Sequence, residues 1–111
     1  MKRKIFVYIA GPISKGDYQT NLKLAVDGAD AVRDAGMVPY SPAVASFLAQ
    51  MFRPRSYEFW MEEDFALIGQ CDALLRLPGE SSGADREITF SKEHGIPVFY
   101  GIKELKEWAA L

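Results

Sequence analysis

The chain has 111 residues, of which 49% are hydrophobic and 25% are charged, and this composition excludes a disordered chain. The net charge of −2 and a pI near 5.4 argue against general nucleic-acid binding, which requires a basic surface. The length predicts a single domain that spans residues 1–111.

The sequence holds one Cys (Cys71) and one His (His94), which excludes an internal disulfide and a Cys/His zinc site within one chain. We therefore expect a reducing, cytoplasmic setting and neither a metal nor another cofactor. No apolar stretch approaches the roughly 18 residues of a membrane span, so no membrane association is expected. Charge is uneven: eight Lys/Arg and four Asp/Glu give +4 over residues 1–55, whereas five and eleven give −6 over residues 56–111.

Strand-like and helix-like segments alternate along the chain, separated by Gly and Pro signals. The continuous apolar run at 5–10 is typical of a strand buried on both faces, and Gly11-Pro12 ends it. Ser56 can cap the helix that follows it. In chain order the sequence predicts a strand at 5–10, a helix at 21–35, a strand at 37–40, a short helix at 43–51, a helix at 57–71, a strand at 72–77, a helix at 84–94, a strand at 96–100 and a helix at 102–111.

This alternation predicts an α/β fold, a Rossmann- or flavodoxin-like three-layer sandwich around a parallel sheet of four or five strands. Ligands of such folds bind at the carboxyl ends of the strands. Three loops are therefore the expected sources of functional residues: residues 11–16, 41–42 and 78–83.

Asp64 breaks an apolar stripe on the helix predicted at 57–71. It lies four residues after Trp60 and four before Ile68, so it faces the same side of the helix. Burying a charge is costly unless the charge is paired or hydrogen-bonded, and such groups often mark sites. Partly apolar surroundings should raise the Asp64 pKa, which suits a proton donor. The alternative is an Asp that caps a neighbouring loop.

Glu87 lies one turn into the helix that is predicted to follow residues 81–83. The N-terminus of a helix favours an anion and lowers a carboxylate pKa, so we expect Glu87 to be ionised. The alternative is a solvated Glu87 that complements the helix dipole or pairs with Arg86 or Lys92.

The loop at 11–16 is neither a P-loop nor a Gly-x-Gly-x-x-Gly turn. Gly11 permits close approach of a ligand, and free N–H groups with Ser14 and Lys15 are able to hold a phosphate. An ordinary turn is the alternative. Tyr8 lies near the carboxyl end of the first predicted strand, where a packed aromatic is the usual case.

Three motifs, taken together, resemble the nucleoside 2-deoxyribosyltransferase superfamily. Residues 8–13 resemble its Tyr-x-x-Gly opening, and residues 81–87 resemble its Ser-x-Gly-x-x-x-Glu segment. Asp64, eight residues before Asp72, matches the spacing of its catalytic Asp. The superfamily contains deoxyribosyltransferases and nucleotide N-hydrolases, and this chain is most similar in motif to the 2′-deoxynucleoside 5′-monophosphate N-hydrolases.

The resemblance implies a mechanism and a set of site residues. Glu87 is the implied nucleophile that traps the sugar as a covalent glycosyl-enzyme, Tyr8 fixes its rotamer, and Asp64 assists departure of the base. Base contacts are expected near residues 41–42 and 47–60. The implied substrate-binding residues are Gly11, Pro12, Ile13, Ser14, Ser81 and Gly83.

Ser81 indicates a phosphorylated substrate within this superfamily. The resemblance places at this position an Asp that binds a free 5′-hydroxyl in the transferases, and a Ser in the monophosphate hydrolases. An acid would repel a phosphate, whereas a hydroxyl and the Gly83 N–H at a helix N-terminus attract one. Lys15, and Arg53 or Arg55, would add positive charge.

The expected function is hydrolysis of the N-glycosidic bond of a (2′-deoxy)nucleoside 5′-monophosphate through a glycosyl-Glu87 intermediate. The expected partners are this small-molecule nucleotide or nucleoside substrate and further copies of the chain, in a homodimer or higher homo-oligomer. One alternative is base exchange, in which a second base replaces water, and another is a non-catalytic nucleotide-binding module on the same fold. A purely structural protein would leave Asp64 on its apolar stripe unexplained.

Overall fold

A computed structural model describes residues 3–110 of the chain. Its four strands form one parallel sheet in the order β2-β1-β3-β4. This sheet confirms the predicted fold class, and a fifth strand is not found within the described residues. The strands are β1 (Phe6–Ala10), β2 (Val38–Tyr40), β3 (Ala73–Arg76) and β4 (Val98–Phe99).

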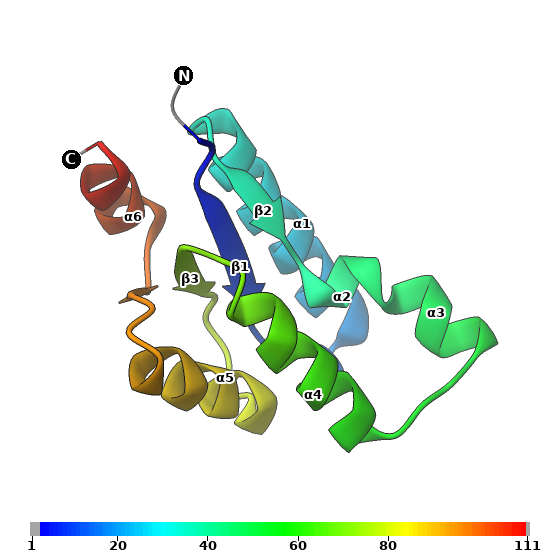
Figure 1. The fold of residues 1–111 in the computed structure, drawn as a ribbon. Coiled ribbons are helices and arrows are strands. Elements are labelled where there is room, and N and C mark those ends of the chain that lie inside the picture. The colour runs from blue at the N-terminus through cyan, green and yellow to red at the C-terminus, as the bar shows by residue number, and fades with distance from the viewer. Residues whose placement is uncertain (1–2, 111) are drawn as a thin grey trace.

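Helices cover both faces of this sheet (Figure 1). One face packs against α1 and α6, and the other packs against α4 and α5, so the predicted three-layer sandwich is confirmed. The short helices α2 and α3 follow β2, and α3 projects away from the sheet. The helices are α1 (Tyr18–Asp34), α2 (Pro42–Ala45), α3 (Phe47–Phe52), α4 (Tyr57–Ile68), α5 (Ser82–Glu93) and α6 (Ile102–Ala109).

The central strand β1 sends alternate side chains to the two faces, as the pleat of a strand requires. Val7 and Ile9 pack into the cluster under α1 and α6. Tyr8 and Ala10 pack into the cluster under α4 and α5. Tyr8, which is fully buried, is therefore on the side of the sheet from which α4 and α5 supply Asp64 and Glu87.

The structure corrects the predicted boundaries of several helices. The single helix predicted at 43–51 is two helices that meet at Ser46, whose hydroxyl donates to the Pro42 carbonyl at 2.5 Å. α1 begins at Tyr18, earlier than predicted, with Asp17 as its N-cap. α4 ends at Ile68 rather than at residue 71. Leu111, the predicted end of the last helix, lies outside the described residues.

Candidate active site

A cleft of about 370 Å³ opens at the carboxyl edge of the sheet, where ligands of parallel sheets are expected to bind. Its walls come from the loop after β1, from the start of α1, from α2, α3 and α4, and from the N-terminus of α5. The structure brings seven of the nine predicted site residues into these walls: Gly11, Ile13, Ser14, Asp64, Ser81, Gly83 and Glu87.

The other two predicted residues, Tyr8 and Pro12, lie behind the cleft wall. Tyr8 donates from its hydroxyl to Glu87 Oε2 at 2.6 Å, so the predicted contact between the two side chains is present. Burial, together with the negative charges of Glu87 and Asp64, holds the Tyr8 pKa far above its usual range. The phenol therefore keeps the proton that it donates. Pro12 is buried and packs closely against Gly79 of the loop after β3.

Asp64 and Glu87 are two carboxyl groups buried side by side in the cleft. Their exposed fractions are 7% and 5%. Burial raises the Asp64 pKa to about 6, against hydrogen bonds with Glu87 and Tyr8 that lower it. This direction agrees with the expectation for Asp64 and differs from the loop-capping alternative, because no such capping bond of Asp64 is found within residues 3–110.

The expectation that the helix N-terminus lowers the Glu87 pKa is wrong. Burial raises this pKa to about 8, and the neighbouring Asp64 charge adds to the rise, while the hydrogen bond from Tyr8 and the charge of Arg76 oppose it. The helix dipole acts mainly within the first turn, and Glu87 lies beyond the first turn of α5. Between pH 6 and pH 8 the pair thus holds about one proton, and Glu87, whose pKa is the higher and is raised further by its hydrogen bond with Asp64, carries it at rest.

The N-terminus of α5 presents hydrogen-bond donors to the cleft. Ser81 is the N-cap, and its Oγ accepts from the Ala84 N–H at 3.1 Å. Because this bond uses Oγ as an acceptor, the hydroxyl proton is free to be donated to a ligand. The N–H groups of Ser82 and Gly83 have no intrahelical partner, as in the first turn of any helix, and both residues line the cleft. This arrangement suits an anionic group.

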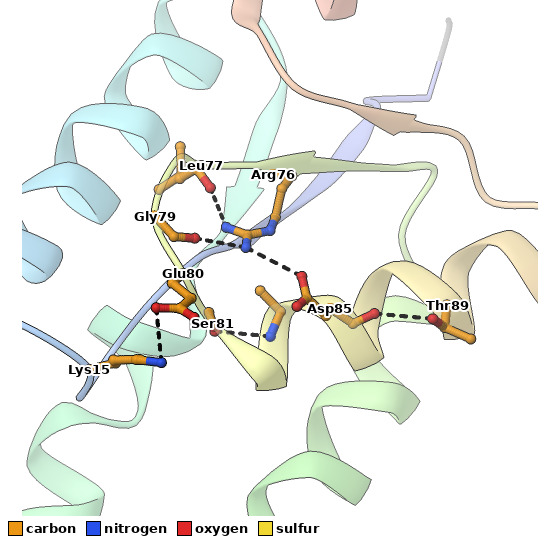
Figure 2. Close-up of polar contacts among 9 residues, drawn as sticks. Lys15, Arg76, Leu77, Gly79, Glu80, Ser81, Asp85 and Thr89 are labelled. Carbon is orange, nitrogen blue, oxygen red and sulfur yellow. Dashed lines mark hydrogen bonds and ion pairs between the residues drawn. The ribbon is translucent and has the colours of Figure 1, made fainter.

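The loop after β1 is held in place from α1. Asn21 is buried and donates from Nδ2 to the carbonyl oxygens of Ile13 at 3.1 Å and Lys15 at 2.7 Å. Lys15 lines the cleft and forms an ion pair with Glu80, at 3.0 Å, across to the loop after β3 (Figure 2). The expected cation is therefore at the cleft, and it has a carboxylate partner that a ligand must compete with.

The outer wall of the cleft is aromatic and polar. Gln50 Oε1 accepts from Trp60 Nε1 at 2.5 Å and from the Arg55 N–H at 3.0 Å, which ties α3 to the start of α4. Arg55 lines the cleft and Arg53 does not. Most of this wall falls in the stretch at 47–60 that was expected to contact a base. Tyr18 also lines the cleft and was not predicted, because the first helix was expected to begin only at residue 21.

Neither a cluster of metal-ligating side chains nor a membrane-spanning helix is found within the described residues. No group of three or more His, Cys, Asp and Glu side chains in residues 3–110 is close enough to hold a metal ion. None of the helices there has the length and apolarity that crossing a membrane requires.

The fold is that of a solved 2-deoxyribosyltransferase from the psychrotolerant bacterium Bacillus psychrosaccharolyticus. The two structures align with a TM-score of 0.64 and 23% sequence identity, over 84% of this chain and 69% of the other. This match confirms the resemblance in fold that the motifs indicated. Residues 5–100 match DUF4406, a family described as a domain of unknown function, and the chain belongs to this family. A comparison with curated protein sequences finds no match.

Proposed function

We propose that this protein cleaves the N-glycosidic bond of a (2′-deoxy)nucleoside 5′-monophosphate and releases the free base and the sugar phosphate. The observation that carries the proposal is that Asp64 and Glu87 meet in one cleft, with the Tyr8 hydroxyl bonded to Glu87 from behind the cleft wall. Two carboxyl groups close together are the equipment of a retaining glycosidase, in which one is the nucleophile and the other the acid. Burying two carboxyl groups side by side costs free energy, and binding of an anionic nucleotide does not require it.

In the first step, an oxygen of the ionised Glu87 carboxylate attacks C1′ of the sugar. The bond from C1′ to the base nitrogen breaks, its electron pair goes to the base, and the base takes a proton from the Asp64 carboxyl. The reactive form of the pair is therefore ionised Glu87 with protonated Asp64, which requires the proton held by Glu87 at rest to pass to Asp64 before the attack. The Tyr8 hydroxyl favours this form, since it donates to the Glu87 carboxylate at 2.6 Å.

In the second step, water attacks C1′ of the glycosyl ester. The bond from C1′ to the Glu87 oxygen breaks and returns its electron pair to the carboxylate, while the proton of the attacking water goes to Asp64. The pair then holds one proton again, as it did at the start.

A 5′-phosphate fits the N-terminus of α5. The Ser81 hydroxyl and the N–H groups of Ser82 and Gly83 supply donors there, and the positive end of the helix favours an anion. Lys15 and Arg55 add positive charge at the cleft. The aromatic wall that includes Trp60 offers flat apolar surface to a base.

Base exchange is the second candidate, because the aligned structure is described as a deoxyribosyltransferase suited to the synthesis of nucleosides. Its first step is the same, and a second base then replaces water in the attack on C1′. Incubation with a nucleotide and a competing free base separates the two reactions, since only exchange yields a new nucleotide.

The test is a panel of nucleoside monophosphates and nucleosides, with the released base detected by chromatography. We expect the wild type to release base from at least one monophosphate and Glu87→Ala to lose about 10³-fold or more of this activity. Glu93→Ala, an exposed Glu on the same helix, is the control and should keep it. Full activity of Glu87→Ala, or tight nucleotide binding by the wild type without turnover over hours, contradicts the proposal.

A further inference from the structure

We propose that Arg76, at the carboxyl end of β3, is a positioning residue for Ser81 and Glu87. Its guanidinium holds the loop after β3 to the first turn of α5 (Figure 2). The assignment rests on the proposed function, because Ser81 and Glu87 are the phosphate ligand and the nucleophile of that reaction. Arg76 itself is not part of the cleft wall, so it acts through these two residues.

The contacts of Arg76 join three points of the chain. Its Nη1 donates to the Leu77 carbonyl, and its Nη2 donates to the Gly79 carbonyl at 2.9 Å. The same Nη2 lies 3.5 Å from Oδ1 of Asp85, in the first turn of α5. The planar fork of a guanidinium suits such a set of acceptors, whereas a lysine ammonium lacks the fixed fork.

Arg76 is nearly buried, so its guanidinium is not simply a hydrated charge on the protein surface. Only 10% of its side chain is exposed, the smallest value among the cations that form ion pairs within residues 3–110. The rest of β3, Ala73 to Leu75, is apolar and buried. A buried guanidinium costs free energy unless its donors are satisfied, and here the backbone carbonyls of an irregular loop satisfy them.

The loop that Arg76 holds has a conformation of its own. Gly79 has φ of +112°, which side chains of other residues rarely allow, and a Cβ there would lie 2.8 Å from Pro12 Cγ. The loop therefore packs against the turn after β1. Ser81, which ends this loop, takes its place relative to both turns from the position of Gly79 and from the bonds to Arg76.

The positive charge of Arg76, like its hydrogen bonds, supports the proposed role of Glu87. It lowers the Glu87 pKa against the burial and the Asp64 charge that raise it. Because the proposed nucleophile must be ionised, Arg76 increases the fraction of reactive enzyme near neutral pH.

The experiment compares Arg76→Met, Arg76→Lys and Arg86→Met. Arg86 is the matched control, because it is an arginine next to Glu87 on α5 whose guanidinium pairs instead with Glu58 at 2.8 and 3.2 Å. The first readout is the titration of the Glu87 carboxyl carbon by NMR in ¹³C-glutamate-labelled protein, with Glu87→Gln used to assign the signal. This readout needs no substrate.

We expect Arg76→Met to move the Glu87 titration to higher pH, while Arg76→Lys, which keeps the charge, and Arg86→Met leave it in place. The second readout is KM. Loss of the fork should raise KM for the monophosphate about 10-fold in both Arg76 variants. Arg86→Met is the control for the titration alone, because the Arg86 guanidinium lies 5.5 Å from the ring centre of Tyr57 in the cleft wall. Arg76→Lys should keep the wild-type Glu87 titration but not the wild-type KM. This result would separate the effect of the Arg76 charge from that of its planar hydrogen-bonding fork.

An unchanged Glu87 titration in Arg76→Met, or equal effects of Arg76→Met and Arg86→Met on this titration, overturns the proposal. If Arg76→Met does not fold, Arg76→Lys decides alone, and an unchanged KM there overturns the positioning role. Failure of the proposed function has a different signature: no variant, the wild type included, cleaves any nucleotide, while the NMR titration still responds to Arg76 and not to Arg86.

Discussion

The hydrogen bond from Tyr8 to Glu87 predicts that removal of the Tyr8 hydroxyl alone lowers the activity strongly. Tyr8→Phe removes the 2.6 Å donor and leaves the ring in its buried place. A hydrogen bond to a charged group contributes roughly 1.5–3 kcal/mol, so we expect kcat to fall about 10- to 100-fold. The Glu87 pKa should rise further in this variant, because a bond that favours its ionised form is gone. The measurement is the pH dependence of kcat/KM.

Tyr40→Phe is the control for this prediction. Tyr40 stacks on Tyr8 with 5.9 Å between ring centroids, and it is not in the cleft wall. The same atom is removed from the neighbouring ring, and kcat should change less than about twofold. Equal losses in the two variants would mean that the aromatic packing, rather than the bond to Glu87, supports the activity.

Single residues also show how far the sequence predicts the site. Asp64 could be predicted because it places a charge on the apolar stripe of its helix. Glu87 could be predicted because it occupies the Glu position of the Ser-x-Gly-x-x-x-Glu motif. The pKa of Glu87 could not, because burial outweighs the helix N-terminus and burial depends on how α4 and α5 pack. Arg76 was missed because its acceptors are backbone carbonyls, whose directions depend on the loop conformation.

At the scale of elements, the start of α5 has two separable roles, a helix cap and an anion site. Ser81→Ala loses the bond to the Ala84 N–H and should lower the free energy of unfolding by about 1 kcal/mol. Ser81→Asp keeps a capping oxygen, so its stability should stay near that of the wild type, but its charge repels a phosphate. We therefore expect KM for the monophosphate to rise about 10- to 100-fold in Ser81→Asp. Urea unfolding and steady-state kinetics measure the two effects.

Ser56→Ala is the control for the cap, because Ser56 Oγ accepts from the Phe59 N–H at 3.1 Å at the start of α4 and lies outside the cleft wall. It should lose similar stability, about 1 kcal/mol, without a change in KM. Ser81→Asp should not raise KM for the unphosphorylated nucleoside, because the new carboxylate is able to accept a hydrogen bond from a free 5′-hydroxyl. A parallel rise for nucleoside and monophosphate would show that the charge does not act on a phosphate.

Element boundaries were predicted less well than element types. The alternation of strands and helices follows from periodicity and from Gly and Pro signals, and all four strands are present. The break at Ser46 between α2 and α3 could not be predicted, because neither Gly nor Pro marks it in the sequence. This break gives α3 its direction, and through Gln50 it shapes the outer wall of the cleft.

At the scale of the whole molecule, the parallel sheet joins groups that are distant in the sequence. Tyr8 and Glu87 are 79 residues apart and meet because β1 and the start of α5 share the carboxyl edge of the sheet. The uneven charge of the two halves has a counterpart here, since Lys15 and Arg55 come from the basic half and Asp64 and Glu87 from the acidic half. This arrangement lowers the free energy of unfolding, because folding buries two carboxyl groups in one cleft.

This burial predicts a pH dependence of stability. The Glu87 pKa rises from 4.5 to about 8 on folding, so between these pH values the folded state binds more protons than the unfolded state. The free energy of unfolding must then fall as pH rises through this range. We expect the wild type to lose roughly 3 kcal/mol or more between pH 5 and pH 8, because one pH unit of pKa shift corresponds to about 1.4 kcal/mol.

Glu87→Gln isolates the contribution of this group, because a neutral amide keeps an acceptor for Tyr8 and has no charge to bury. It should be as stable as the wild type near pH 5 and more stable by about 1 kcal/mol or more at pH 8. Urea unfolding at both pH values measures this, with Glu93→Gln as an exposed control that keeps the wild-type dependence. Parallel curves for the wild type and Glu87→Gln would mean that Glu87 is not protonated in the folded state. Because Glu87→Gln also removes the nucleophile, the same substitution should stabilise the fold and abolish cleavage, which is the expected sign of a site that sacrifices stability for chemistry.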